Sequence, residues 1–392
     1  MGYGGGGGGG GSGSGGGGGS VGAAGAGDGG YTTVGGGSAF GGSDAFELPS
    51  LNQAPAGSIR FNTESKKLEV YILGPVGVTT LPNGIWMEVD SWSPDLMTGG
   101  TRGLFAGGFV APLRKNEIDY INIASTGNAI DFGNLTTERG EGSGFSSRTR
   151  ALWAGNSVPN SNNTIDVVTI SSTGNAENYG DLLAATGVHQ GSAGLANATR
   201  GIFAGGYVVP TGRVDIIQYT TIDTNGNTID FGNLTAANSG LAGAGNATRG
   251  LFMGGSAPGN VNTIDYITIS TQGNAADFGD LTLTDQGGGG SSNAVRALFF
   301  EAGNATINYL TIATLGNAKD FGDLTAATNH YSGGSPSSST RACYGGGGFP
   351  SVTNVIDNVQ IMTTGNSKDF GDLTVARSLM PRGNCSNGHG GL

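Results

Sequence analysis

The sequence predicts an all-β protein in which residues 98–392 form one closed, six-bladed β-propeller. Residues 46–97 are predicted to form a small β-strand module, and residues 1–45 a glycine-rich, low-complexity segment. Three observations lead to this fold class. One sequence unit repeats six times, each unit contains four short strand-like runs, and glycine makes up 79 of 392 residues while only 12% are charged.

The repeat is clearest in an eight-residue motif. Thr-Arg-Gly-Leu-Phe-Ala-Gly-Gly at residues 101–108 returns with small changes at residues 199–206 and 248–255. Weaker copies fill the gaps, and the arginine of the motif recurs at Arg102, Arg150, Arg200, Arg249, Arg296 and Arg341. By subtraction, neighbouring arginines are 48, 50, 49, 47 and 45 residues apart, which is the length of a four-stranded propeller blade.

Each unit contains four runs, named a to d in the order that they take across a blade. Strand b is the arginine motif, which ends in a glycine pair. Strand c alternates apolar and polar residues, as at residues 118–123 and 264–269, and a period of two indicates a strand. A pair such as Gly127-Asn128 follows in every unit and is predicted to form the tight turn into strand d, which has the pattern of residues 131–135. A glycine- and serine-rich strand a then leads into the next unit.

The order of the runs predicts how the ring closes. The first unit begins with strand b at Thr101, and one strand-a segment remains after the sixth strand d, from Arg377 to about Gly390. We predict that this C-terminal segment joins strands b, c and d of the first unit. Six blades packed in a ring would then bury one another's faces and leave only short sheet edges.

Composition argues against several classes of partner. The net charge is −11 and the sequence pI is near 4.6, whereas nucleic-acid affinity is built mainly from lysine and arginine, so no nucleic-acid partner is expected. The N-terminus lacks the pattern of a secretory signal, and no run approaches the roughly 18 apolar residues of a membrane helix, so no membrane insertion is expected. Cys343 and Cys385 are too few for a disulfide framework and lack the spacing of a zinc site.

The N-terminal hundred residues contain two different segments. Residues 1–45 cannot bury a core, so they are either a flexible linker or a segment that copies from several chains order together, which leaves a homo-oligomer open. Residues 57–62, 67–71 and 84–89 are predicted to form three paired strands.

Several motifs suggest chemistry, but their repetition favours a structural role. Asp-Phe-Gly recurs in five units without the lysine or the catalytic loop of a kinase. The arginine of strand b and the aspartate of strand c also recur, and we interpret them as polar contacts between blades. No catalytic residue, metal site or cofactor is predicted, since the histidines lie at non-equivalent places. A glycosidase would need two carboxylates across a cleft, and the strand-a segments carry only Glu141 and Asp285.

These features resemble a known repeat. Four features of the units look like a Kelch repeat: the glycine pair, the apolar-Asp-x-x-x-Ile run of strand c, the aromatic residue of strand d, and the basic residue that follows it, as at Arg139 and Arg377. Phe or Tyr replaces the tryptophan that is usual in strand d. The units are also similar to propeller modules in virion and tail-fibre proteins of tailed bacteriophages. Residues 57–92 resemble a short module of phage tail and fibre proteins.

The resemblance implies a non-enzymatic structural protein of the virion, made in the host cytoplasm, such as a tail fibre, spike or surface adhesin. Residues 1–97 would attach it to other virion proteins, and the propeller would bind a host surface glycan or protein. Two alternatives remain. One is a capsid or tail decoration protein that contacts only other virion proteins, and the less favoured one is a polysaccharide-cleaving enzyme.

One face of the propeller is the expected binding surface. The connections between strands b and c differ in every unit, while the Gly-Asn pair at the opposite face is nearly constant. Variable loops on a rigid scaffold are where recognition usually resides. Aromatic and basic residues of the b–c loops are the candidates for the ligand face: Phe109, Arg114, Lys115, Tyr207, Arg213 and Phe349.

Overall fold

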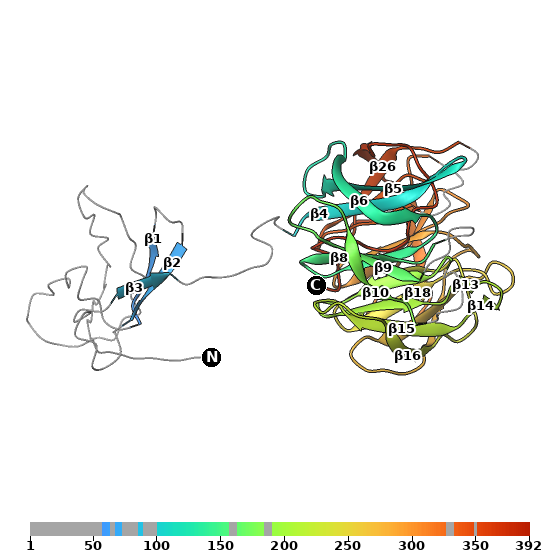
Figure 1. The fold of residues 1–392 in the computed structure, drawn as a ribbon, viewed down its shortest axis with the longest axis horizontal. Helices are drawn as coiled ribbons and strands as arrows, with labels where there is room; N and C mark the ends of the chain where they lie inside the picture. The colour runs from blue at the N-terminus through green and yellow to red at the C-terminus, as the bar shows by residue number, and fades with distance from the viewer. Residues whose placement is uncertain are drawn as a thin grey trace, which may run out of the picture. The chain divides into compact units, whose positions relative to one another are not determined.

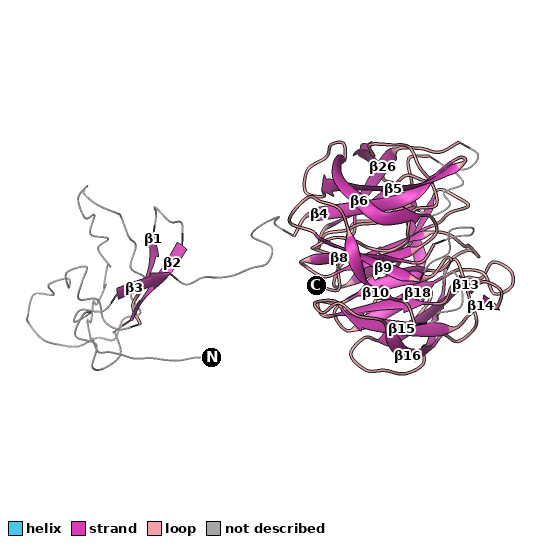
Figure 2. Cartoon of the chain, in the orientation of Figure 1, coloured by secondary structure: helices cyan, strands magenta, loops and turns pink. Residues whose placement is uncertain are grey.

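The structure is a computed structural model, and it describes residues 57–62, 67–72, 85–88, 100–156, 163–183, 190–326, 333–348 and 351–392. The chain divides into two units, residues 1–92 and 93–392, each with its own internal contacts. Every regular element within the described ranges is a β-strand (Figure 2), and no helix there is long and apolar enough to cross a membrane.

The first unit contains a three-stranded antiparallel sheet. Its strands, in the order β1-β2-β3, are β1 (Ile59–Asn62), β2 (Lys67–Ile72) and β3 (Ile85–Glu88), which confirms the three predicted strands. The ring centroids of Tyr71 and Trp86 are 5.2 Å apart, and the Arg60 guanidinium lies over the same indole. Arg60 also pairs with Glu69 at 2.5 Å. These cross-strand contacts give the short sheet one packed face.

The second unit is a six-bladed β-propeller, as predicted (Figure 1). The first blade contains β4 (Arg102–Val110), β5 (Leu113–Asn122) and β6 (Ile130–Arg139). The second blade contains β7 (Ser143–Ser146), β8 (Arg150–Ala154), β9 (Thr164–Thr169) and β10 (Glu177–Asp181). The third blade contains β11 (Ala193–Ala196), β12 (Arg200–Ala204), β15 (Ile216–Thr221) and β16 (Ile229–Asn233). The fourth blade contains β17 (Ala242–Gly245), β18 (Arg249–Met253), β19 (Thr263–Thr268) and β20 (Ala276–Asp280). The fifth blade contains β21 (Gly289–Ser292), β22 (Arg296–Phe300), β23 (Thr306–Thr311) and β24 (Lys319–Asp323). The sixth blade contains β25 (Arg341–Gly345), β26 (Val355–Gln360) and β27 (Lys368–Asp372).

Strand a of the sixth blade is present as two bridges, which pair Gly334 with Gly345 and Ser337 with Ala342. An additional hairpin of β13 (Tyr207–Val208) and β14 (Gly212–Arg213) extends the b–c connection of the third blade.

The ring closes within the first blade, as the order of the runs predicts. Gly103 of β4 pairs with Ser386 of the C-terminal segment. Farther along β4, Phe109 and Ser378 exchange two backbone hydrogen bonds, of 2.7 and 3.1 Å. Since β5 lies on its other side, β4 is an inner strand rather than an exposed edge.

The hydrophobic core lies between the blades. One cluster joins Phe300 of the fifth blade to Tyr344 of the sixth, with the two rings stacked at 4.9 Å. Another joins Ile356 of the sixth blade to Phe105 of the first, so the core also continues across the closure. Figure 1 shows β26 of the sixth blade beside β5 of the first. Adjacent blades therefore bury one another's apolar faces, which no blade does alone.

The arginine of strand b bonds each blade to the next. Arg200 donates from Nη1 to the Ile269 carbonyl of the fourth blade at 2.7 Å, and its guanidinium lies 4.4 Å from the ring centroid of Tyr219. The same bond is made by Arg102 to Ile170, Arg150 to Ile222, Arg249 to Ile312, Arg296 to Ile361 and Arg341 to Ile123. The last of these crosses from the sixth blade to the first. The interpretation of this arginine as a contact between blades is confirmed.

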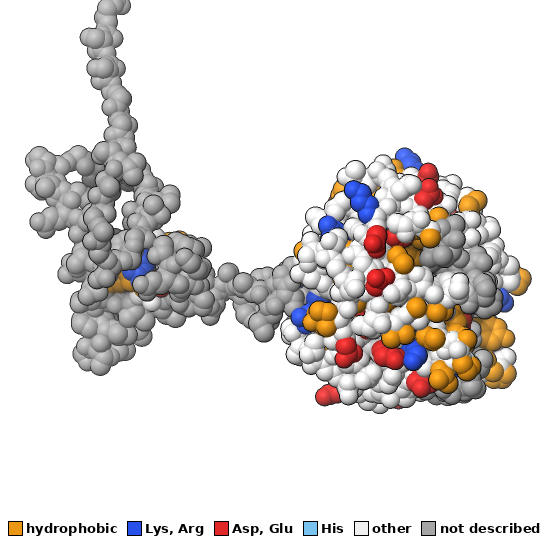
Figure 3. All heavy atoms as spheres, turned by 90° about the horizontal axis from the view of Figure 1, so that it is seen from above, with side chains coloured by type: hydrophobic (Ala, Val, Ile, Leu, Met, Phe, Trp, Pro, Cys, Tyr) orange, Lys and Arg blue, Asp and Glu red, His pale blue; other side chains and the backbone are white. Residues whose placement is uncertain are grey.

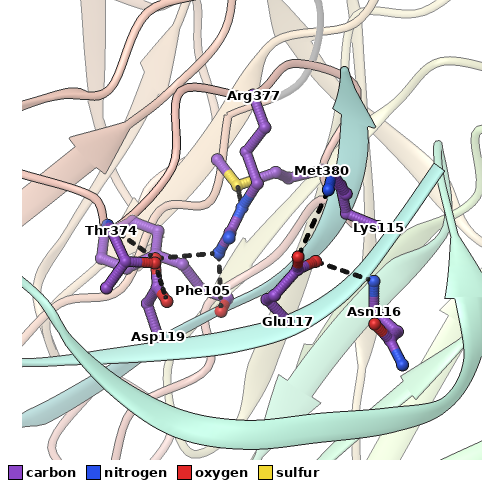
Figure 4. Close-up of polar contacts among 8 residues, drawn as sticks. All are labelled: Phe105, Lys115, Asn116, Glu117, Asp119, Thr374, Arg377 and Met380. Carbon is purple, nitrogen blue, oxygen red and sulfur yellow. Dashed lines mark hydrogen bonds and ion pairs between the residues drawn. The ribbon is translucent and has the colours of Figure 1, made fainter. Parts of the chain in front are cut away.

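The aspartate of strand c makes a second contact between blades. Asp166 of the second blade accepts hydrogen bonds from the amide and the hydroxyl of Thr136 in the first, at 3.1 and 2.5 Å. Asp119 of the first blade accepts the same two bonds from Thr374 beyond the sixth strand d, and Arg377 lies 3.2 Å away (Figure 4). The closure therefore repeats the polar contact that joins other blades.

The Gly-Asn pair does not form the turn between strands c and d, so that prediction is wrong. In the first blade the chain turns earlier, at residues 123–125. Gly127, at φ 152°, instead donates to the Phe370 carbonyl of the sixth blade at 2.9 Å, and the Asn128 side chain accepts from the Asp372 amide at 3.1 Å. The pair is nearly constant because it bonds one blade to its neighbour, a contact that every blade must make.

The glycine of the repeated Asp-Phe-Gly motif allows this close approach. Gly133 has φ 147°, and a Cβ atom there would lie 2.3 Å from the carbonyl oxygen of Gly174 in the next blade. Phe132, which precedes it, is buried in the core between the first and second blades. The motif is thus a packing element between blades.

The glycine-rich strands a surround the central channel. A Cβ atom at Gly243 would lie 2.3 Å from the Gly194 carbonyl oxygen, and one at Gly194 would lie 2.5 Å from the Gly144 oxygen. At these positions the backbones of neighbouring blades therefore approach too closely to admit a side chain, which explains the glycine there.

The last residues of the chain fill one end of the channel. His389 Nε2 lies 2.7 Å from the Ser146 carbonyl of the second blade, and the Gly390 amide donates to the Ser292 carbonyl of the fifth at 3.0 Å. Figure 1 shows the C-terminus on one side of the propeller and the β13–β14 hairpin on the other. The channel is therefore occupied at the end where strands a and b are joined.

Candidate functional site

A pocket of about 350 Å³ lies at the opposite end of the channel, on the side of the b–c loops. Its rim is formed by successive d–a connections that are joined by backbone hydrogen bonds. The Gly191 amide donates to the Glu141 carbonyl at 2.7 Å, the Gly240 amide to the Gly191 carbonyl at 2.6 Å, and the Gly287 amide to the Gly240 carbonyl at 2.8 Å. The glycines add no side chains to this rim, so the pocket stays open.

The third blade supplies an aromatic and a basic residue to the pocket. Tyr207 and Arg213 face each other in the β13–β14 hairpin, and both line the pocket. Tyr207 as a whole residue is 38% exposed. Arg213 donates from Nη2 to Ser256 Oγ at 2.9 Å, while its buried Nε atom has no hydrogen-bond partner. The structure thus brings together two residues that the sequence nominates for the ligand face.

Arg382 lines the pocket from the C-terminal segment and is only 4% exposed. Its Nε and Nη1 atoms are buried without a hydrogen-bond partner. Two other buried arginines, Arg139 and Arg377, are instead paired with carboxylates at 3.1 and 3.2 Å. Leaving N–H donors of a buried charged group without acceptors costs stability, so Arg382 differs from these two ion-paired arginines.

The electrostatics of the pocket depend on few groups. Burial lowers the pKa of the Arg382 guanidinium, and the negative charges of Glu141 and Asp285 oppose that shift. Glu141 is the one carboxylate among the described residues that line the pocket, and it accepts a hydrogen bond from Gln190 Nε2. Two guanidinium groups therefore outnumber the acidic side chains of the lining.

A buried carboxyl group lies close to this site. Burial raises the pKa of Asp285 to about 6, although hydrogen bonds from the Ala302 and Gln286 amides act against the shift. Those amides lie 2.5 and 2.8 Å from its two oxygen atoms. Both oxygens are thus engaged by the backbone, which leaves Asp285 in a structural role.

The remaining ligand-face candidates lie away from the pocket. Phe109 and Arg114 pair with each other in the long β4–β5 hairpin, and Lys115 of the same hairpin reaches Glu117 at 3.4 Å (Figure 4). All three candidates are partly buried. Phe349 lies outside the described residues. A contact of these four residues with a ligand stays a prediction.

Sequence reasoning missed Arg382, although a signal for it exists. The pairing of Gly103 with Ser386 sets the register of the C-terminal segment, and Arg382 stands four residues before Ser386. At the corresponding register the other blades have Gly142, Ser192, Leu241, Gly288 and Gly333. A single arginine at a position otherwise held by small or apolar residues marks an exception to the repeat.

Other reactive side chains of the described residues lie in the core. Cys343 and Cys385 are buried free thiols whose pKa values are raised by burial. No group of three His, Cys, Asp or Glu side chains within the described part of the chain could hold a metal ion. On the face seen in Figure 3, acidic and basic side chains are scattered among uncharged ones.

The fold and this pocket define the second unit as a six-bladed β-propeller with a polar, arginine-lined pocket at one end of its channel. The sequence matches no protein-family model and no curated protein.

Proposed function

We propose that the protein is a non-enzymatic, adhesive component of a tailed-bacteriophage particle whose propeller binds a glycan or protein on the host surface. One observation supports the binding role: the polar residues that repeat in every blade form bonds between blades, whereas several that do not repeat line one pocket. The repeated ones, such as Arg200, are bonded between blades. Tyr207, Arg213 and Arg382 each stand outside the repeat pattern and meet at one pocket.

The virion assignment is supported by the sequence. The Kelch-like units are similar to propeller modules of phage virion proteins, and residues 57–92 resemble a module of phage tail and fibre proteins. In this proposal residues 1–97 attach the protein to other virion proteins. The propeller is then presented to the host surface.

Binding fits the chemistry of the pocket better than hydrolysis does. Glycosidases place two carboxyl groups on either side of the scissile bond. Glu141 is the one carboxylate among the described lining residues, and the buried Asp285 has both oxygens bonded to backbone amides. The pocket instead offers donors, amides and an aromatic ring, which suit recognition.

Adhesion assays test the proposal. Purified protein is incubated with a panel of bacterial strains, with phage particles, and with surface polysaccharide from the strains that bind it. We expect adhesion to particular strains without release of reducing sugar. Tyr207→Ala, at an unchanged melting temperature, is expected to weaken adhesion, whereas Lys319→Gln on an outer strand is the matched surface control.

Two results would contradict the proposal. Binding to phage particles alone would make the protein a decoration or scaffold component. Release of reducing sugar from the polysaccharide would make it a polysaccharide-cleaving enzyme.

A further inference from the structure

We propose that the pocket at the open end of the channel binds the carboxylate of an acidic sugar, held by Arg382 and Arg213 with the Tyr207 ring against the sugar. The inference rests on the proposed binding function and names the chemical class of its ligand. It is carried by Arg382 and Arg213, which both line this pocket and both contain buried guanidinium N–H groups without a hydrogen-bond partner.

Arg382 is built into the site by its backbone. Its amide donates to the Gly142 carbonyl at 3.0 Å, and its carbonyl accepts from the Gly144 amide at 2.7 Å. These bonds hold the residue in place as part of the strands around the channel. The backbone is thus fixed before any ligand arrives, and the side chain is buried, with Nε and Nη1 atoms that have no protein acceptor. Such preorganisation reduces the cost of binding.

Arg213 provides a second, independently held guanidinium. Its Nη2 group is oriented by Ser256 Oγ at 2.9 Å, and its Nε atom is also buried without a partner. A carboxylate has two oxygens that accept several hydrogen bonds, and arginine is the side chain best matched to its planar geometry. The proposed carboxylate would therefore accept hydrogen bonds from these two arginines, which line the same pocket.

The other lining groups favour a sugar over a simple anion. Gln190 and Gln286 offer amide donors and acceptors, and the Glu141 carboxylate offers an acceptor for hydroxyl groups. The exposed ring of Tyr207 gives an apolar face, against which the C–H face of a sugar ring can pack. The volume of about 350 Å³ is at the lower end of small-molecule sites, which suits one or two sugar residues.

Calorimetric titration of the full-length protein tests the site with defined probes. D-Glucuronate is the acidic sugar, D-glucose the matched neutral sugar, and inorganic sulfate the simple anion. We expect glucuronate to bind and glucose not to bind. Arg382→Gln and Arg213→Gln should each weaken glucuronate binding on the order of tenfold or more, while Lys319→Gln leaves it unchanged.

Stability provides a second readout. Since the Nε and Nη1 atoms of Arg382 are buried without a hydrogen-bond partner, Arg382→Gln should melt at the same temperature as wild type or higher. Bound glucuronate should raise the melting temperature of the wild type but not that of the variant. If Arg382→Gln does not fold, the Arg213→Gln titration decides the question.

Three outcomes would overturn the site: equal heats from glucose and glucuronate, unchanged glucuronate affinity in both arginine variants, or tighter binding of sulfate than of glucuronate. The adhesion assay separates this inference from the proposed function. Undiminished adhesion by both arginine variants would overturn the site alone. Glucuronate binding by a protein that adheres to no strain would support the site and overturn the adhesive role.

Discussion

The guanidinium of Arg377 lies 3.2 Å from the carboxylate of Asp119, although these residues come from opposite ends of the propeller sequence (Figure 4). Both side chains are fully buried. Asp119 also accepts two hydrogen bonds from Thr374, and Arg377 reaches the Phe105 carbonyl at 3.4 Å. One buried group of polar contacts thus ties the last strand of the propeller to the first blade.

Replacing Arg377 by Met is expected to lower the free energy of unfolding by about 3 kcal/mol, because it leaves the Asp119 carboxylate buried without its cation. Urea denaturation measures the change. A double-mutant cycle with Asp119→Asn should show strong coupling between the two positions. A change within about 0.5 kcal/mol, the size expected at a surface site, would contradict the role of this pair in closure.

Two truncations test the contribution of the closing strand and that of the residues that fill the channel separately. A protein ending at Thr374 loses every partner of β4 on its inner side and is expected to lose cooperative unfolding. A protein ending at Ser386 keeps the pairing with Gly103 and should unfold cooperatively at a lower temperature. Circular dichroism during heating distinguishes the two. Equal melting curves for the full chain and the protein ending at Thr374 would refute the closure.

Arg200→Ala is expected to reduce stability without affecting adhesion. It removes a charge-assisted bond to the Ile269 carbonyl and the stacking on Tyr219, which together contribute on the order of 1.5 to 3 kcal/mol. Thermal melting and the adhesion assay are measured on the same sample. Unchanged melting together with lost adhesion would reverse our interpretation of the repeated arginine.

His389 should make the propeller sensitive to acid. Its Nε2 atom lies 2.7 Å from the Ser146 carbonyl and its Nδ1 atom accepts from the Gly391 amide, so the neutral imidazole fits the site. Burial lowers its pKa from 6.5 to about 4. The unfolded chain therefore binds a proton first as the pH falls, and the free energy of unfolding should decrease between pH 6.5 and 4 by at most about 3 kcal/mol.

Comparison with His389→Gln isolates this contribution. The stability advantage of the wild type over the variant should shrink as the pH falls from 7 to 4, as measured by urea denaturation. The comparison removes the contribution of Asp285, whose raised pKa acts in the opposite direction. An advantage that stays constant over this range would show that His389 does not titrate as its burial implies.

The sequence predicts the architecture well, because every repeat contains the same four strand patterns of a propeller blade. The spacing of the arginine motif indicates the number of blades, and the strand left over after Thr374 indicates the closure. Local turn preferences place the Gly-Asn pair in a turn, because they take no account of the neighbouring blade. Its partner, such as Phe370 for Gly127, lies far away in sequence.

The pocket was only partly predictable. Tyr207 and Arg213 belong to a variable loop and could be nominated from the sequence. Arg382 lies in the C-terminal segment, which the sequence predicts only as the closing strand, and its place at the pocket depends on how this segment crosses the channel. Glu141 and Gln190 belong to d–a connections, whose meeting at the axis follows from ring geometry rather than from any local pattern.

The closure within the first blade also has a mechanical consequence. A force applied through residue 100 enters the propeller at Arg102, whose amide donates to Asn387 Oδ1 at 2.9 Å and whose carbonyl accepts from the Asn387 amide. β4 is bonded to the C-terminal segment on one side and to β5 on the other, so tension along β4 shears both rows of hydrogen bonds together instead of peeling one. Rupture under tension is governed by the rate of unfolding, and this arrangement opposes it where tension enters the ring.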